Sequence, residues 1–227
     1  MLQIFTTLNI QIFITVAREN KSQQVVLFGN TSKGELVMEK EKVDVLIVVD
    51  MQNDFVTGAL GTPEAQAIVP KVVEKIKNWK GPVFYTMDTH NEDYLNTQEG
   101  KHLPIVHCVE GTDGWKLINE IGDDFVTDYE QIYHKKTFGS YELFIDATLD
   151  DNQRIYQTLF PGNVDSITLI GLCTDICVIT NALILKTAKP EVPIIVDASC
   201  CAGVTPESHK NALAAMKMCQ IEIVNEG

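Results

Sequence analysis

The chain has 227 residues, of which 45% are hydrophobic and 22% charged. This length and composition suffice to bury one large core, so we expect a single α/β-sized domain. The formal charge of −13, from 18 Lys and Arg against 31 Asp and Glu, repels phosphate backbones and anionic lipid. Because the basic residues form only short clusters, we expect no nucleic-acid partner.

The cysteines and the N-terminal segment bear on the compartment. Six Cys at irregular spacing do not resemble the disulfide framework of a small secreted domain, which favours the reducing cytoplasm. Polar residues interrupt the apolar first twenty residues, and no basic region precedes them, so we predict neither a signal peptide nor a membrane span. We expect residues 1–40 to be an extension, disordered or artefactual, and residues 41–227 to form the domain.

From residue 41 onward, short apolar runs alternate with amphipathic stretches. Helical patterns are expected at 63–80, with a break or fresh start at Pro70, and at 112–122, 176–189 and 206–219. Strands are expected at 43–50, 82–88, 129–135, 165–171, 193–198 and 221–224. This order predicts a three-layer α/β/α fold with a mostly parallel, six-stranded, doubly wound sheet.

Reactive side chains fall where these predicted strands end. Asp50 ends the first strand, Asp88 the second and Lys136 the third, while Cys177 lies just beyond the fourth at a helix start. In open parallel sheets, ligand sites lie beyond the carboxyl ends of the strands. The sequence therefore predicts one site at one edge of the sheet.

The residue types at this edge suit nucleophilic catalysis. A helix N-terminus lowers the pKa of a thiol such as Cys177 and favours its thiolate. Asp50 follows five apolar residues and needs a cationic partner, which Lys136 could supply while Asp50 accepts a proton. Taken singly, a core-filling cysteine, a helix cap and a surface lysine are the ordinary explanations of these residues.

A second pattern points to a metal. Asp88 and His90 are two residues apart in extended chain, so both side chains can reach one ion, and His107 is a candidate third ligand. Two imidazoles and one carboxylate suit zinc, iron or manganese. The remaining histidines, expected at the surface or behind the ligands, are His102, His134 and His209.

Four sequence blocks carry a family resemblance. They are VVDMQNDF at Asp50, KKTFGSYE at Lys136, GLCTDICV at Cys177, and DASCCAGVTPESHKNAL near the C-terminus. In this combination, residues 43–226 resemble the isochorismatase-like cysteine hydrolase superfamily, and within it the nicotinamidases, also called pyrazinamidases. The resemblance implies the three-layer fold already expected from the strand and helix order.

The resemblance also implies a mechanism. Asp50 would accept the proton of Cys177, whose sulfur would attack a carboxamide carbon, and Lys136 would hold the charges in place. Ammonia would leave a thioester that water then hydrolyses. The backbone amides of Cys173 and Cys177 would form the oxyanion site, with a cis peptide bond between Leu172 and Cys173.

For the substrate, the resemblance implies nicotinamide or a related carboxamide, with its ring nitrogen on a divalent metal held by Asp88, His90 and His107. It implies Phe55 and Leu172 as substrate-binding residues, a role in pyridine nucleotide salvage, and allows a homo-oligomer. Three positions depart from the family pattern: Cys173 where an alanine is usual, Leu103 where an aromatic residue is usual, and Tyr141 where a small residue is usual.

Three alternatives stay open. One is a metal-independent hydrolase of the same superfamily acting on another small amide, a ureido acid or a vinyl ether. Another is a catalytically silent binding protein of the same fold. The third is a redox or metal-thiolate site at CTDIC and Cys200-Cys201, whose spacing lacks the usual pairing.

Overall fold

The computed structural model describes residues 42–126, 131–149 and 160–226, and five short strands nearer the N-terminus. The chain divides into two compact units, Met1–Lys42 and Val43–Gly227. In the first unit, β1 (Phe13–Thr15), β4 (Val26–Asn30) and β5 (Leu36–Met38) form an antiparallel sheet, and β2 (Arg18–Glu19) pairs with β3 (Ser22–Gln23). Most of the predicted extension, residues 1–40, lies outside the described residues.

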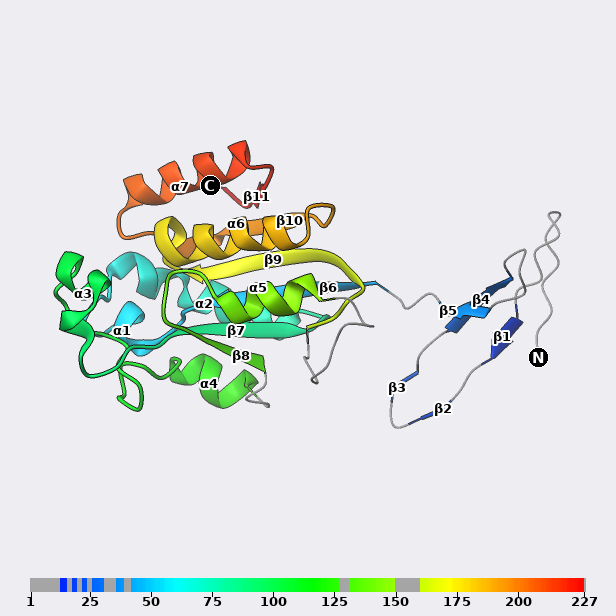
Figure 1. Cartoon of the computed structure of the whole chain (residues 1–227), viewed down its shortest axis with the longest axis horizontal. Helices are drawn as coiled ribbons and strands as arrows, with labels where there is room; N and C mark the ends of the chain where they lie inside the picture. Colours follow the sequence, from blue (N-terminus) through cyan, green and yellow to red (C-terminus); the bar gives the residue numbers. More distant parts are fainter. Residues whose placement is uncertain are drawn as a thin grey trace. The chain divides into compact units, whose positions relative to one another are not determined.

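The second unit is built on a six-stranded sheet in the order β11-β10-β9-β6-β7-β8, labelled in Figure 1. All neighbouring strands in it are parallel. The strands are β6 (Val43–Val49), β7 (Val83–Asp88), β8 (Ile132–Lys135), β9 (Val164–Leu172), β10 (Ile194–Ala202) and β11 (Glu222–Val224). The predicted sheet is thus confirmed, although the first two residues of the strand expected at 129–135 lie outside the described residues.

Helices connect these strands. They are α1 (Asn53–Val56), α2 (Pro63–Asn78), α3 (Gln98–His102), α4 (Asn119–Phe125), α5 (Tyr141–Thr148), α6 (Ile179–Ala188) and α7 (Pro206–Met218), with a 3₁₀ turn η1 (Tyr94–Asn96) and a π-helical turn η3 (Thr174–Val178). The sequence did not predict α5, which has only eight residues. Its N-cap is Ser140, whose side chain accepts a hydrogen bond from the amide of Leu143.

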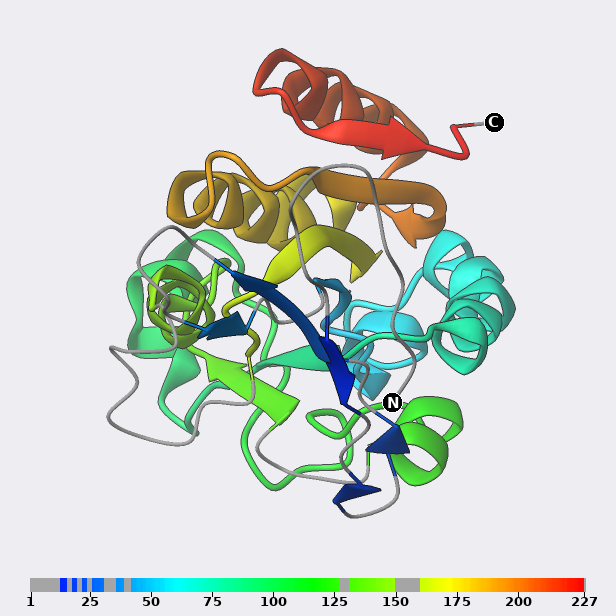
Figure 2. The same cartoon turned by 90° about the vertical axis from the view of Figure 1, so that its right-hand side faces the viewer.

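The two faces of the sheet carry separate cores, because side chains alternate along each strand. On β6, Val45, Ile47 and Val49 pack in a cluster with buried residues of α5, α6 and α7. Leu46 and Val48 face the other way and pack with buried residues of α2 and α4. Figure 2 shows α2 and α6 on opposite sides of the sheet, which completes the three layers.

Pro70 neither breaks nor restarts the helix that contains it, contrary to the sequence prediction, since α2 runs unbroken from Pro63 to Asn78. Proline removes the amide that would bond the carbonyl four residues earlier, here that of Gln66. Both Pro70 and Gln66 lie on the exposed side of α2, where water can satisfy that carbonyl. The loss of one hydrogen bond is therefore tolerated.

Gly171 fixes the backbone just before the turn that carries Cys177, and it gives a first prediction. Its φ is +114°, and a Cβ there would lie 2.1 Å from the carbonyl oxygen of Val49. We expect Gly171→Ala to destabilise the protein by about 3 kcal/mol or more, lowering Tm by roughly 10 °C. Thermal unfolding followed by circular dichroism measures this.

The matched control is Gly122→Ala in α4, where the nearest atom to a new Cβ is 3.5 Å away. Alanine there should leave Tm unchanged or raise it slightly. Equal Tm values for the two variants would contradict the close approach of Gly171 to β6.

Among the described residues, no helix has both the length and the apolar character needed to cross a membrane.

Candidate active site and metal cluster

Four neighbouring strands bring the candidate catalytic residues to one edge of the sheet. Asp50 follows β6, Asp88 ends β7, Lys135 ends β8, and Cys177 lies in η3 directly after β9. The Lys135 ammonium lies 2.7 Å from Asp50 Oδ2 and 3.3 Å from Asp88 Oδ1, and it donates to Cys177 Sγ at 3.4 Å. All four side chains are buried. They form one charged cluster at the carboxyl edge, beside the switch in strand order between β9 and β6.

The lysine in this cluster is Lys135, which corrects the sequence prediction of Lys136. Side chains alternate along β8, so Tyr133 and Lys135 are buried while His134 and Lys136 are exposed. The register pairs Lys135 with Asp88 across β7 and β8. Lys136 is exposed and lines the cavity described below. An error of one residue in a strand moves a side chain to the opposite face.

Asp50 is held on both sides. Its Oδ1 accepts a hydrogen bond from Thr86 Oγ1 at 2.7 Å, and its Oδ2 faces the Lys135 ammonium. Burial raises the pKa of the Asp50 carboxyl, with Lys135 opposing that shift. Burial would also lower the pKa of Lys135, but the charges of Asp50, Cys177 and Asp88 raise it well above its usual value. Lys135 therefore stays an ammonium ion.

The surroundings of Cys177 favour its protonated thiol over the thiolate. Burial raises its pKa well above the usual value, and although Lys135 opposes the shift, the charges of Asp50 and Asp88 add to it. The predicted lowering of this pKa by a helix N-terminus is thus wrong. Cys177 is the fourth residue of η3 and is almost completely buried, so desolvation outweighs the helix dipole. A proton acceptor is needed, and Asp50 is in place to be one.

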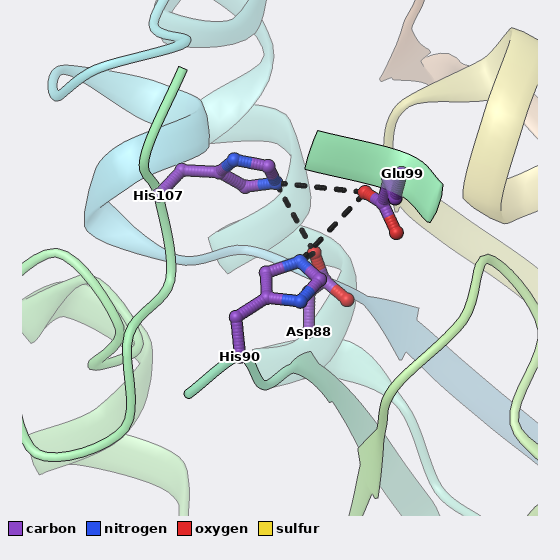
Figure 3. Close-up of side chains that lie close together, drawn as sticks. All are labelled: Asp88, His90, Glu99 and His107. Carbon is purple, nitrogen blue, oxygen red and sulfur yellow. Dashed lines mark hydrogen bonds and ion pairs between the residues drawn. The ribbon is translucent and has the colours of Figure 1, made fainter. Parts of the chain in front are cut away.

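Next to this cluster, four potential metal ligands converge, as Figure 3 shows. Asp88, His90, Glu99 and His107 each offer one donor atom, and these atoms lie within 4.8 Å of one another. Asp88 Oδ2 lies 2.9 Å from His90 Nε2 and 3.5 Å from His107 Nε2. Glu99 Oε1 lies 3.7 Å and 3.9 Å from the same two nitrogens. The predicted Asp88, His90 and His107 are thus brought together.

No sequence pattern pointed to Glu99 as a metal ligand. It lies on the short helix α3, nine residues after His90, in a segment that contains other acidic residues such as Glu92 and Asp93. No two-residue spacing relates it to another ligand. Only the path of the chain between β7 and His107 brings its carboxylate to the two imidazoles.

The donor set fits a divalent transition metal. An ion with bonds of about 2.1 Å in tetrahedral geometry separates its ligand atoms by about 3.4 Å, and the four carboxylate–imidazole distances run from 2.9 to 3.9 Å. Burial and the charge of Asp88 raise the pKa of Glu99, because two carboxylates that converge repel each other unless a cation separates them. Two imidazole nitrogens and two carboxylate oxygens suit zinc, iron or manganese.

Surrounding groups orient the two imidazoles and keep Asp88 ionised. His107 Nδ1 lies 2.7 Å from the carbonyl oxygen of Ile105, which leaves Nε2 free to face the other donors. The ring of buried Tyr94 lies 4.6 Å from that of His90 and 4.9 Å from that of His107. Burial by itself would raise the pKa of the Asp88 carboxyl. Hydrogen bonds from both histidines and the charge of Lys135 outweigh burial and hold this pKa far below its usual value.

Gln52 and Asp54, two residues of the block that begins at Val48, position the metal-binding loops. The Gln52 amide donates to the carbonyl of Asp88 at 2.8 Å and accepts from its N–H at 2.7 Å, so it fixes the backbone of β7 where the ligand sits. Asp54 Oδ2 accepts from the amide of Cys108 at 2.7 Å, next to His107. Both contacts join residues far apart in sequence, and each restrains one ligand.

The two clusters open into one cavity of about 880 Å³. Its wall includes Cys177, all four metal-binding candidates, and the residues predicted for the substrate and the oxyanion site, namely Phe55, Leu172 and Cys173. Leu103, the departure from the expected aromatic residue, also lines it. The peptide bond between Leu172 and Cys173 is cis, as the resemblance implied. The oxyanion role of the Cys173 and Cys177 amides stays a prediction.

The other histidines lie outside the four-residue cluster. His102 lines the cavity, His134 stacks on Trp115 at 5.5 Å, and His209 Nδ1 lies 2.8 Å from Thr174 Oγ1. All six cysteines are free, and the group of converging potential metal ligands found among the described residues contains no cysteine.

Comparison with known proteins agrees with this architecture. The nicotinamidase of Schizosaccharomyces pombe is 26% identical over 208 residues, covering 80% of this chain and 92% of its own. The nicotinamidase of Escherichia coli is 28% identical over 196 residues, covering 76% and 89%. The crystal structure of the pyrazinamidase of Pyrococcus horikoshii in complex with zinc matches with a TM-score of 0.62 and 30% identity, covering 80% and 98%.

A family model, described as the isochorismatase domain, matches residues 44–225. That range contains the six-stranded sheet except its first residue, Val43, and every candidate residue named above. Taken with the parallel sheet and the cluster at its carboxyl edge, this match shows that the chain belongs to the isochorismatase-like hydrolase superfamily.

Proposed function

We propose that the protein is a metal-assisted amidohydrolase of the nicotinamidase type, which converts nicotinamide or a related heteroaryl carboxamide to the carboxylic acid and ammonia. One observation carries this proposal. The Asp50, Lys135 and Cys177 cluster and the four-donor cluster line or adjoin the same cavity and share a contact, the 3.3 Å pair between Lys135 and Asp88. Similarity to nicotinamidases supports the substrate class.

In the first step, the Cys177 sulfur attacks the carboxamide carbon while its proton passes to Asp50, which shares the Lys135 ammonium as a neighbour with the thiol. Asp50 then delivers the proton to the leaving nitrogen, so ammonia departs and a thioester remains. Water, deprotonated by Asp50, hydrolyses the thioester to the acid and restores the thiol. Lys135 remains charged throughout and stabilises whichever of Asp50 and Cys177 is anionic.

Asp88, His90, Glu99 and His107 would hold the divalent ion. The ion, when bound, would supply Lewis acidity and a binding point for a heteroaryl nitrogen. Phe55, whose ring lies 5.6 Å from that of His107, would pack against the substrate ring. These side chains orient the substrate so that its carboxamide faces Cys177.

The function is tested by ammonia release from nicotinamide, measured on metal-loaded and chelator-treated protein. We expect steady release from the metal-loaded protein and its loss after chelation, with recovery when zinc, iron or manganese is returned. Release that survives chelation would favour the metal-independent hydrolases of the superfamily. No release from metal-loaded protein would exclude nicotinamide as the substrate.

Glu99 gives a prediction that does not depend on turnover. We expect Glu99→Gln to lower metal affinity by about tenfold or more, because the amide replaces a charged ligand with a neutral one. Equilibrium dialysis with elemental analysis measures the affinity, and the stabilisation of Tm by added metal provides a second readout. Glu92→Gln, an exposed residue of the same segment, is the control. Equal affinities of the two variants would remove Glu99 from the site.

A further inference from the structure

The cavity is much larger than the substrate of the proposed function requires. A single-ring carboxamide occupies roughly the volume of five waters at about 30 Å³ each, whereas the cavity holds about 880 Å³. Cavities of about 300 to 1,000 Å³ typically enclose ligands of drug size, with more than one ring. Most of the cavity therefore lies beyond the ring that the metal and Cys177 would hold.

The exposure of the wall residues separates the deep part from the mouth. Leu172 is 1%, Cys177 5% and Phe55 8% exposed, so the reacting groups lie at the bottom. Phe138 and Val204 line the same cavity but are 46% and 50% exposed, which places them at the mouth. The substrate's reacting end thus lies deep, and any substituent on it extends toward these two residues.

The mouth is apolar where a substituent would pass. Phe138 follows β8 and Val204 follows β10, and the half-buried Ile176 and Leu60 also line the cavity. Large apolar side chains left exposed around a cavity are typical of a ligand-binding surface. Polar residues also line the cavity, namely Thr62, Thr97, Gln98, His102, Lys136 and Thr137, so the lining is apolar only in part.

Resting on the proposed function, we propose that this apolar wall, Leu60, Phe138, Ile176 and Val204, binds an apolar substituent of the substrate. The preferred substrates would then be heteroaryl carboxamides that carry a second ring or a short alkyl chain, rather than the unsubstituted ring. The wall would act on binding of the substituent, since none of its four residues belongs to the catalytic or metal-binding clusters.

The test compares nicotinamide with 5-phenyl- and 6-phenylnicotinamide in the ammonia assay, using metal-loaded protein. We expect kcat/KM for at least one phenyl derivative to exceed that for nicotinamide by about tenfold or more, because a buried phenyl group adds apolar contact. If nicotinamide is hydrolysed and both phenyl derivatives are hydrolysed more slowly than nicotinamide, the inference is overturned and the proposed function stands. No hydrolysis of any of the three would overturn the proposed function and the inference with it.

Variants locate the effect. Val204→Trp should narrow the mouth of the cavity and lower kcat/KM for the preferred phenyl derivative about tenfold or more. The kcat/KM for nicotinamide should change less than about threefold. Leu183→Trp, at a 36% exposed position of α6, should change neither. Phe138→Ala gives a second measure, since loss of the aromatic wall should raise KM for the phenyl derivative alone. Equal losses for both substrates in Val204→Trp and Phe138→Ala would overturn the assignment of the wall.

Discussion

Replacing Cys177 with alanine is expected to lower kcat for carboxamide hydrolysis by at least about 10⁴-fold, because no other group can form the thioester. The thiol is the only cysteine sulfur among the described residues that contacts Lys135. The small side chain of alanine should keep the fold, so circular dichroism should match wild type. Ammonia release under single-turnover and steady-state conditions measures the loss.

Cys173→Ala is the matched control for this variant. Cys173 lies four residues earlier at the same cavity, and an alanine is usual there in the family that the sequence resembles. We expect its kcat to stay within about tenfold of wild type. If Cys173→Ala were inactive and Cys177→Ala active, the nucleophile would have been assigned to the wrong cysteine.

The second large effect concerns the two adjacent lysines. Lys135→Met should lower kcat by at least about a thousandfold, because it removes the cation that faces both Asp50 and Cys177. It should also destabilise the fold by about 3 kcal/mol, since two buried carboxylates lose their ion-pair partner. A protein of this size would then lose roughly 10 °C in Tm. Ammonia release and thermal unfolding are the two measurements.

Lys136→Met is the matched control for Lys135→Met, because it removes the same positive charge from the neighbouring residue. Lys136 is exposed, and Asp50 pairs with Lys135 instead, so replacement of Lys136 should change Tm by less than about 2 °C and kcat by less than about threefold. The reverse outcome, with Lys136→Met inactive and Lys135→Met normal, would restore the original sequence prediction. It would also contradict the register of β8 against β7.

The reading of the fold from sequence succeeded because its signals are local. Apolar runs such as Val43–Val49 identify buried strands by composition alone, and alternation with helical patterns implies parallel strands with crossover connections. The carboxyl ends of parallel strands share one edge, so Asp50, Asp88 and Cys177 could be assigned to one site before any distance was known. The prediction of a helix break at Pro70 was wrong because it considered residue type alone. The free-energy cost of proline inside a helix also depends on its surroundings, and Pro70 lies on the exposed face of α2.

Tertiary structure decided the details that chemistry depends on. Lys135 rather than Lys136 reaches Asp50 because the pairing of β8 with β7 fixes which side chains face inward, and a sequence pattern does not fix register to one residue. Glu99 joins the metal cluster through the course of the chain from β7 to His107. The raised pKa of Cys177 comes from burial, which outweighs the helix-terminal effect that its sequence position suggested.

The sequence by itself determined the element order, the edge that carries the site and the residue types gathered there, because these follow from periodicity and chain direction. Only the packed structure decided which lysine, which carboxylate and which protonation state occupy that edge. Those depend on distances of a few ångströms between strands and loops that are remote in sequence, and on how completely each charge is removed from water.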